Sequence, residues 1–376
     1  MNIRVNPDFP AELKKYGKGE WNDCFHCGNC TAICPLTENN NLFPRRSIRL
    51  LQMGLGDQLA LNVDPWLCYY CGDCSKTCPR NANPGELMMS LRRYLTSIYD
   101  WTGLSKRFYT THFWEFGMII VLSLFVISLF AFVLPPLDPT LTAQGGVKIN
   151  QFAPVEWIEI GDWTMAVIVA ALLISNILHM YYKVILSDKS IKIPFLSYFK
   201  EFWLLIVHFL TQLRFSKCDA EGKRYWFGHW LLMSGYTIMF TVIVVFLPWF
   251  QTEEIHPLYH PQRFLGYYAT FGLLFGLLFA LIGRIKKTSE KFKFSHFSDW
   301  FFIIMLILTT VTGIMVHIFR VNGMPEATYY TYIAHLAILV PMIMIEVPFS
   351  KWSHLAYRPF AVYFSNLKNT ALAQQK

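Results

Sequence analysis

Six apolar runs of about 20 residues each follow one another through the second part of the chain. They occupy residues 112–134, 163–184, 226–249, 263–284, 299–319 and 331–350. A helix of about 20 apolar residues can cross roughly 30 Å of lipid hydrocarbon, and it satisfies its backbone hydrogen bonds internally. We therefore predict six membrane-spanning helices, which excludes a single soluble globule and a disordered chain.

A seventh apolar stretch, Phe202–Leu210, is too short to cross a bilayer. It lies within residues 197–214, a segment that also carries Lys200, Glu201, Gln212 and Arg214. A short helix with one apolar face and several polar residues is typical of the membrane surface. We expect this segment to be an interfacial amphipathic helix.

Basic residues are distributed unevenly over the segments that connect the runs. If residues 1–107 are cytoplasmic, 21 lysines and arginines lie in the inner segments, and the outer segments hold only Lys148, Arg263 and Arg320. The positive-inside rule then predicts six spans in the cytoplasmic (inner) membrane, with both termini in the cytoplasm. The net charge of +8 is explained by this topology, and we expect no nucleic-acid partner.

Charged and cysteine residues are concentrated before the first run. Residues 1–107 hold 23 of the 58 charged side chains, and eight of the nine cysteines lie between Cys24 and Cys78. The first residues have no apolar core typical of a secretory signal, so we expect a cytoplasmic location, where clustered thiols bind metals more often than they form disulfides. We predict two domains, a cysteine-rich head at 1–107 and a membrane body at 108–376.

The eight cysteines form two copies of the motif C-x2-C-x2-C-x3-C-P, one starting at Cys24 and the other at Cys68. Two-cluster ferredoxins use this motif, and their fourth cysteine binds the other cluster. The first predicted 4Fe–4S cluster is therefore held by Cys24, Cys27, Cys30 and Cys78, and the second by Cys68, Cys71, Cys74 and Cys34. The alternative is a pair of zinc sites, but zinc motifs usually combine two separate C-x2-C halves.

The residues between the two motifs predict a helix over Phe43–Gly54, begun by Pro44 and ended by Gly54. This favours a helical ferredoxin head over a β-rich one. The predicted fold class is therefore all-α: a helical two-cluster ferredoxin domain, then a six-helix transmembrane bundle with one interfacial amphipathic helix. The arginines of the Phe43–Gly54 helix form either a solvated face or a docking surface for an acidic partner.

Histidines gather at two levels of the predicted bundle. The inner level holds His112, His179, His229 and His354, and the outer level holds His317 and His335. Histidines within membrane helices are natural haem ligands, and two levels favour two haems. For any single histidine, hydrogen bonding at the membrane interface is the alternative.

Two resemblances follow from these motifs. The head resembles the C-type subunit of heterodisulfide reductases, through both cysteine motifs and the arginine-rich helix. The body resembles the E-type subunit of those reductases and, more distantly, the gamma subunit of respiratory nitrate reductase, through Pro348–Lys351 before His354. The fusion of head and body resembles the C-type subunit of the quinone-interacting membrane-bound oxidoreductase (Qmo) complex.

The resemblance to the nitrate reductase subunit suggests ligands for two haems b. We expect His229 and His354 to bind the inner haem. For the outer haem we expect His317 and His335, with Met239 as the rival ligand because it lies ten residues after His229, where that family has a histidine.

The chain departs from the nitrate reductase pattern in the geometry of His335 and His354, which are 19 residues apart. On one ideal helix they would lie about 100° apart in direction. We expect Pro341 and Pro348 to kink the helix and absorb this offset.

Glu346 lies inside the sixth run, about 12 Å along the helix axis from His354. A carboxylate there is unfavourable in lipid, which indicates a role with protons or quinone. The alternatives are pairing with a polar group of a neighbouring helix or a tilt toward the inner interface. Cys218 has no partner by spacing, and we expect a plain thiol.

These features together predict the membrane anchor and electron-transfer subunit of a quinol:acceptor oxidoreductase. The chain has no dinucleotide-binding or P-loop motif, so flavin chemistry belongs to partner subunits. The resemblance implies menaquinone as the lipid substrate, flavin- and iron–sulfur-containing subunits of A and B type, and adenylylsulfate reductase of sulfur metabolism as the soluble partner. The alternatives are the membrane subunit of a heterodisulfide reductase-type complex and a redox-sensing membrane protein.

Overall fold

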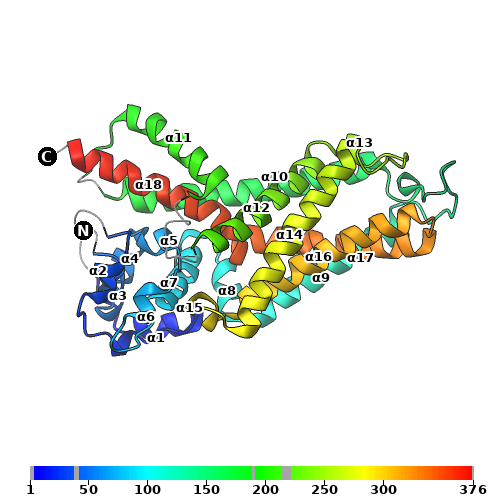
Figure 1. Cartoon of the computed structure of the whole chain (residues 1–376). Helices are drawn as coiled ribbons and strands as arrows, with labels where there is room; N and C mark the ends of the chain where they lie inside the picture. Colours follow the sequence, from blue (N-terminus) through cyan, green and yellow to red (C-terminus); the bar gives the residue numbers. More distant parts are fainter. Residues whose placement is uncertain (1–3, 38–41, 189–190, 214–221, 375–376) are drawn as a thin grey trace.

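The computed structural model describes residues 4–37, 42–188, 191–213 and 222–374, and Figure 1 shows an almost wholly helical chain. Within this described part, the isolated β-bridge pairs Leu141 with Val147. The predicted all-α fold class is therefore confirmed. Cys218 and Arg214 lie outside the described residues.

The head consists of short helices around the cysteine motifs and two helices that lead toward the body. They are α1 (Phe9–Leu13), η1 (Lys14–Tyr16), η2 (Trp21–Asp23), α2 (Asn29–Ile33), α3 (Arg45–Gln52), α4 (Gly56–Ala60), α5 (Asp64–Leu67), α6 (Asp73–Lys76), α7 (Pro84–Tyr99) and α8 (Leu104–Thr110). The predicted helix between the motifs is α3. Gly54 ends it with a φ of +69°, and a Cβ there would lie 2.3 Å from the carbonyl oxygen of Asn6, so only glycine fits.

Six long helices form the body, and each is long and apolar enough to cross a membrane. They are α9 (His112–Phe132), α10 (Val155–Tyr181, extended by the π-helical turn η4, Tyr182–Leu186), α12 (Gly222–Val244), α14 (Pro261–Lys286), α16 (Phe297–Val321) and α17 (Pro325–Phe349). The six predicted spans are thus confirmed by length and composition. The bundle is elongated, and the described chain begins and ends on the side of the head (Figure 1).

Short elements connect the long helices at both ends of the bundle. They are η3 (Ile149–Gln151), α13 (Leu247–Phe250), α15 (Glu290–Lys293) and η6 (Lys351–Ser353). The α15 turn covers the second cysteine motif, because a Cβ on Gly72 would lie 2.5 Å from the Cβ of Glu290. The connection between α14 and α16 therefore packs directly against the head.

Two further helices, α11 (Phe195–Thr211) and α18 (His354–Gln374), pack together on the head side of the bundle (Figure 1). The Thr370 hydroxyl donates to Glu201 at 3.0 Å across this contact. The opposite face of α11 exposes large apolar side chains, among them Phe195, Phe199 and Trp203. The expected amphipathic helix is therefore present as α11, and its position at a lipid surface stays a prediction.

Helix α18 connects the head to the body. The Tyr357 ring is fully buried, with its centre 5.2 Å from that of Trp66 and 5.8 Å from that of Tyr99. Both partners belong to the head, and the same hydrophobic cluster continues into Ile177 and Met180 of α10. Because apolar burial of large aromatic rings is strongly stabilising, this shared core fixes the head on one end of the bundle.

Helices α12 and α14 approach each other closely because glycines line their contact. A Cβ on Gly272 would lie 2.7 Å from the Leu231 carbonyl oxygen, and one on Gly276 would lie 2.8 Å from the Gly228 carbonyl oxygen. Small residues four apart allow this kind of packing in membranes, where no hydrophobic effect drives helices together. Since α12 carries His229, this contact positions a candidate ligand.

We predict that Gly276→Val destabilises the bundle, because the new side chain would overlap α12 and force the two helices apart. Overpacking of this kind costs about 1–3 kcal/mol, which a lowered thermal unfolding midpoint in detergent would register. Gly117→Val is the matched control, since no atom lies within 4 Å of a Cβ at that position. Equal midpoints for the two variants would contradict the close helix contact.

Candidate functional site

Each cysteine motif turns at a glycine that follows its second cysteine. Gly28 and Gly72 have φ values of +89° and +92°, a left-handed conformation that glycine adopts without steric cost. The short helices α2 and α6 start directly after these glycines, and the third cysteine of each motif lies in the first turn. The local sequence therefore places three thiols of each motif around one turn of chain.

The two motifs pack against each other, and the fourth cysteines cross between them. Asn29 of α2 donates to the Thr77 carbonyl at 3.0 Å. One small cavity is lined by Cys34 of the first motif and by Cys68, Cys71 and Cys74 of the second.

The other group of thiols gathers around Cys30. Burial raises the pKa of the Cys30 thiol, and charge on Cys24, Cys27 and Cys78 adds to the effect. The structure thus brings together both predicted sets of four cysteines. Ligation itself stays a prediction.

The cysteine thiols have the properties expected of ligands for a positively charged metal centre. Burial raises the pKa of Cys34 to about 12, and charge on Cys68 and Cys71 adds to it. Thiolates are the metal-binding form, so these side chains favour deprotonation only when metal is bound. Among the described residues, no three His, Cys, Asp or Glu side chains converge on one ion position; a 4Fe–4S cluster receives each thiolate at a separate iron.

Two arginines of α7 lie beneath the second motif. The Arg92 guanidinium donates from Nε to the Pro65 carbonyl at 2.7 Å and also contacts the Cys68 carbonyl. The Arg93 side chain is 4% exposed and donates to the Tyr16 carbonyl at 3.0 Å. The sequence indicates only the positive charge of these two residues, whereas the structure shows that they also organise the core of the head.

The buried carboxylate of Asp299 forms ion pairs with basic side chains from three parts of the chain. It contacts Lys351 of η6, Arg93 at 3.3 Å and Arg284 of α14 at 3.8 Å. It also accepts the backbone N–H of His296 at 3.0 Å, which caps α16. The head, the bundle and the turn after α17 are thus joined at one carboxylate.

The same network continues to the second cysteine motif. Arg93 lies 3.6 Å from Glu86, and the Tyr70 hydroxyl donates to Glu86 at 2.6 Å. Tyr70 stands between Cys68 and Cys71. Burial raises the pKa of Glu86, while the Arg93 charge opposes that rise. A continuous run of polar contacts therefore leads from the cysteines to Lys351.

His229 of α12 and His354 of α18 lie close together at the end of the bundle that carries the head. Their ring centres are 6.3 Å apart. A metal–imidazole nitrogen bond is about 2 Å long and the ring centre lies about 1 Å further out, so two axial imidazoles on one iron have ring centres roughly 6 Å apart. The two rings therefore lie close enough for one metal ion to bind between them; haem ligation stays a prediction.

The protonation of His354 also suits a ligand. Its Nδ1 lies 2.7 Å from the Lys351 carbonyl oxygen, which can only accept, so Nδ1 carries the proton and Nε2 keeps its lone pair. Burial lowers the pKa of His354 to about 3, so the ring is neutral at physiological pH.

The helix that was expected to carry both His335 and His354 is two helices. Helix α17 runs through Pro341 and ends at Phe349, and α18 begins at His354 after the η6 turn. The expectation of a single helix that carries both histidines was wrong, whereas a kink at Pro341 or Pro348 within α17 stays a prediction. The helix ends at Phe349 and restarts at His354, so the two histidines need not lie on one face of a single helix.

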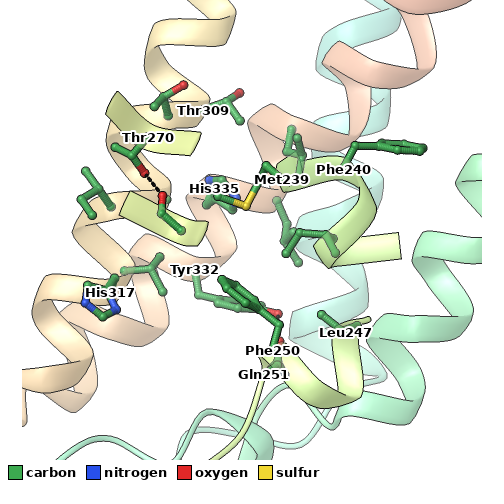
Figure 2. Close-up of a pocket in the computed structure, with 18 of the residues that line it drawn as sticks. Met239, Phe240, Leu247, Phe250, Gln251, Thr270, Thr309, His317, Tyr332 and His335 are labelled. Carbon is green, nitrogen blue, oxygen red and sulfur yellow. Dashed lines mark hydrogen bonds between the residues drawn. The ribbon is translucent and has the colours of Figure 1, made fainter. Parts of the chain in front are cut away.

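The outer histidines line a cavity of about 280 Å³ between α12, α14, α16 and α17 (Figure 2). His335 lies 3.0 Å from the Thr312 hydroxyl. His317 is instead held by the Tyr267 hydroxyl at 2.9 Å and by Arg263. Figure 2 shows the Met239 sulfur directed toward His335, with the His317 ring further along α16. The structure thus places all three candidates on one cavity, but His317 interacts with α14.

Glu346 is completely buried, and it lies against Glu115 of α9, which is also completely buried. The role predicted for Glu346 is untested by this geometry, but its neighbour is a second carboxyl group. Sequence reasoning missed Glu115 and Asp299. Each is an acidic residue inside a predicted span, the same signal that singled out Glu346.

Comparison with known proteins supports the iron–sulfur head. Residues 20–82 match the family described as a 4Fe-4S dicluster domain. A protein from Archaeoglobus profundus that is similar to the C-type subunit of heterodisulfide reductase is 34% identical over 88 residues, which cover 23% of this chain and 47% of that protein. The chain thus spans about half the length of this curated relative. No solved structure matches the chain. The head is therefore similar to the C-type subunit of a heterodisulfide reductase, attached to a body whose helices fit a membrane.

We predict that Cys34→Ala removes the same cluster as Cys71→Ala, while Cys78→Ala removes the same cluster as Cys24→Ala. Each variant should retain about four of about eight irons, because each loses one of two cubanes. Iron content and the electron paramagnetic resonance spectrum of the reduced protein check this. If Cys34→Ala matched Cys24→Ala instead, the crossed arrangement would be wrong.

Proposed function

We propose that the chain is the membrane anchor and electron-transfer subunit of a quinone-reactive oxidoreductase. It exchanges electrons between menaquinone in the bilayer and the cytoplasmic subunits of a larger complex. The observation that carries the proposal is the pairing of His229 with His354 at the end of the bundle that bears the cysteine head. An electron carrier there connects the lipid phase with the iron–sulfur domain.

The head holds two 4Fe–4S clusters in this proposal. Cys24, Cys27, Cys30 and Cys78 hold the first, and Cys68, Cys71, Cys74 and Cys34 hold the second. Support comes from the two groups of thiols and from the match to a dicluster domain. Arg92 contacts the backbone carbonyl of Cys68, so it holds the start of the second motif in place.

His229 and His354 hold an inner haem b, which supplies a one-electron carrier when bound. The surroundings of His354 suit an iron ligand, because the Lys351 carbonyl fixes the tautomer of the ring and burial keeps the ring neutral. Lys351 is in turn held by Asp299. The ligand is therefore oriented by the same network that attaches the head.

His335 holds an outer haem b at the cavity between α12, α14, α16 and α17. Its partner is His317 or Met239, and the arrangement favours Met239 because His317 hydrogen-bonds to Tyr267. Haems bound at these two sites would lie on the line from the bilayer to the head.

The flavin chemistry belongs to partner subunits of A and B type, and adenylylsulfate reductase is the soluble partner. These assignments rest on the resemblance of the whole chain to the C-type subunit of the quinone-interacting membrane-bound oxidoreductase complex. The matched relative favours a second candidate, the membrane subunit of a heterodisulfide reductase-type complex. The two differ in the soluble acceptor that a purified complex uses.

The experiment for this proposal counts haem in the purified full-length protein and its variants. We expect b-type visible bands in the wild type and the loss of about one haem per protein in His354→Ala and in His335→Ala. Met239→Ala should lose the outer haem, and His317→Ala should retain it. His260→Ala is the control, because the His260 ring stacks on His256 in a loop. Absence of haem from the wild type would overturn both quinone-linked candidates.

A further inference from the structure

Glu115 and Glu346 form a carboxyl pair inside the inner part of the bundle. Both side chains are 0% exposed, and they come from α9 and α17, two helices that fit a membrane. The Ser350 hydroxyl donates to Glu115 Oε1 at 2.9 Å, and the two carboxyl groups are direct neighbours. The protein itself thus surrounds two acidic groups that have no water-exposed surface.

The hydrogen bonds of this pair are incomplete unless it carries a proton. Glu115 Oε2 and both carboxyl oxygens of Glu346 find no donor with good geometry among the described side chains. The donors nearby are the Ser350 hydroxyl and the Lys351 backbone N–H. An ionised carboxylate is only an acceptor, whereas a protonated one also donates. One proton on the pair supplies the missing donor between the two groups.

The balance of charges around Glu115 and Glu346 also indicates that the pair carries one proton. Two carboxylates in contact in a low-dielectric interior cannot both be ionised without strong repulsion. The neighbouring Lys351 ammonium is already bound to Asp299, together with Arg93 and Arg284. Those three cations face two carboxylates, Asp299 and Glu86, and leave one positive charge in excess.

A carboxyl pair with one proton carries the single negative charge that balances this excess. Among the described residues, the buried Tyr109 hydroxyl of α8 is a further titratable group near the pair, and burial raises its pKa, so it stays neutral. His296 lies beyond Tyr109, with ring centres 6.2 Å apart. Burial lowers the pKa of His296 to about 3, so it adds no charge at neutral pH.

The same turn of chain touches the carboxyl pair and the inner histidine pair. Ser350 donates to Glu115, and the next residue, Lys351, accepts from His354 through its carbonyl. Consecutive residues thus contact both sites, so a charge that arrives beside His354 lies near the Glu115–Glu346 pair. Uncompensated charge in this interior is unfavourable, so a proton that follows the electron stabilises it.

We propose that Glu115 and Glu346 together hold one proton at rest and take up a second when an electron arrives at the His229–His354 site. The electron comes from quinol and the proton from the cytoplasmic side, so the net charge of the inner end is unchanged. When the electron moves on to the head, the second proton leaves. This coupling rests on the proposed function, whereas the resting shared proton does not.

Infrared spectroscopy of the full-length protein in detergent tests the shared proton. We expect a protonated-carboxyl stretch at pH 7 that shifts in D₂O and disappears in both Glu115→Gln and Glu346→Gln. In each variant the glutamine amide donates to the remaining carboxylate and keeps the net charge of the pair, so that carboxylate stays ionised. Glu156→Gln, an exposed residue at the start of α10, is the control and should keep the band.

Persistence of the band in either glutamine variant, or its absence from the wild type, would overturn the shared proton. If one variant does not fold, the other gives the same test from the opposite helix. This measurement needs no haem, so its failure is distinct from failure of the proposed function.

The coupling is tested by a redox titration of the b-type absorption between pH 6 and pH 8. We expect the inner midpoint potential to rise as pH falls in the wild type, because the second proton stabilises the reduced form. The slope should be lost in Glu346→Gln. An equal slope in wild type and variant would overturn the coupling.

Discussion

Asp299 stands in the first turn of α16, and three cations from distant parts of the chain converge on its carboxylate. Arg93 comes from the head, Arg284 from the inner end of α14 and Lys351 from the turn between α17 and α18. A buried charge with these partners is stable only when all are in place, because removal of one leaves the others uncompensated. The position of the head on the bundle and the direction of His354 both depend on this contact.

The head lies at one end of the elongated helical bundle (Figure 1). Thiol groups gather in the head, the His229–His354 pair lies at the head end of the bundle, and a mostly apolar cavity lined by His317 and His335 lies toward the far end. The contacts from Tyr70 through Glu86 and Arg93 to Lys351 join the first two levels. Electron carriers bound at these two levels would need no large motion of the chain between steps.

The sequence predicted the features that local pattern determines. Apolar length predicted the six spans, and the repeated motif predicted which thiols would meet, since glycine turns at Gly28 and Gly72 place them. The C-terminal helix α18 was missed, although Tyr357, Ala361 and Phe364 follow helical spacing and are buried. The Asp299 network and the Glu115–Glu346 pair were also missed, because their members are far apart in sequence and only tertiary packing brings them together.

The most direct test of this account follows electrons between the clusters and quinone in the full-length protein. The clusters are reduced chemically and mixed with a menaquinone analogue, and their reoxidation is followed by electron paramagnetic resonance. The account predicts rapid reoxidation in the wild type and at least about tenfold slower reoxidation in His354→Ala, with both clusters still present. Equal rates in the two proteins would contradict an electron path through the His229–His354 site.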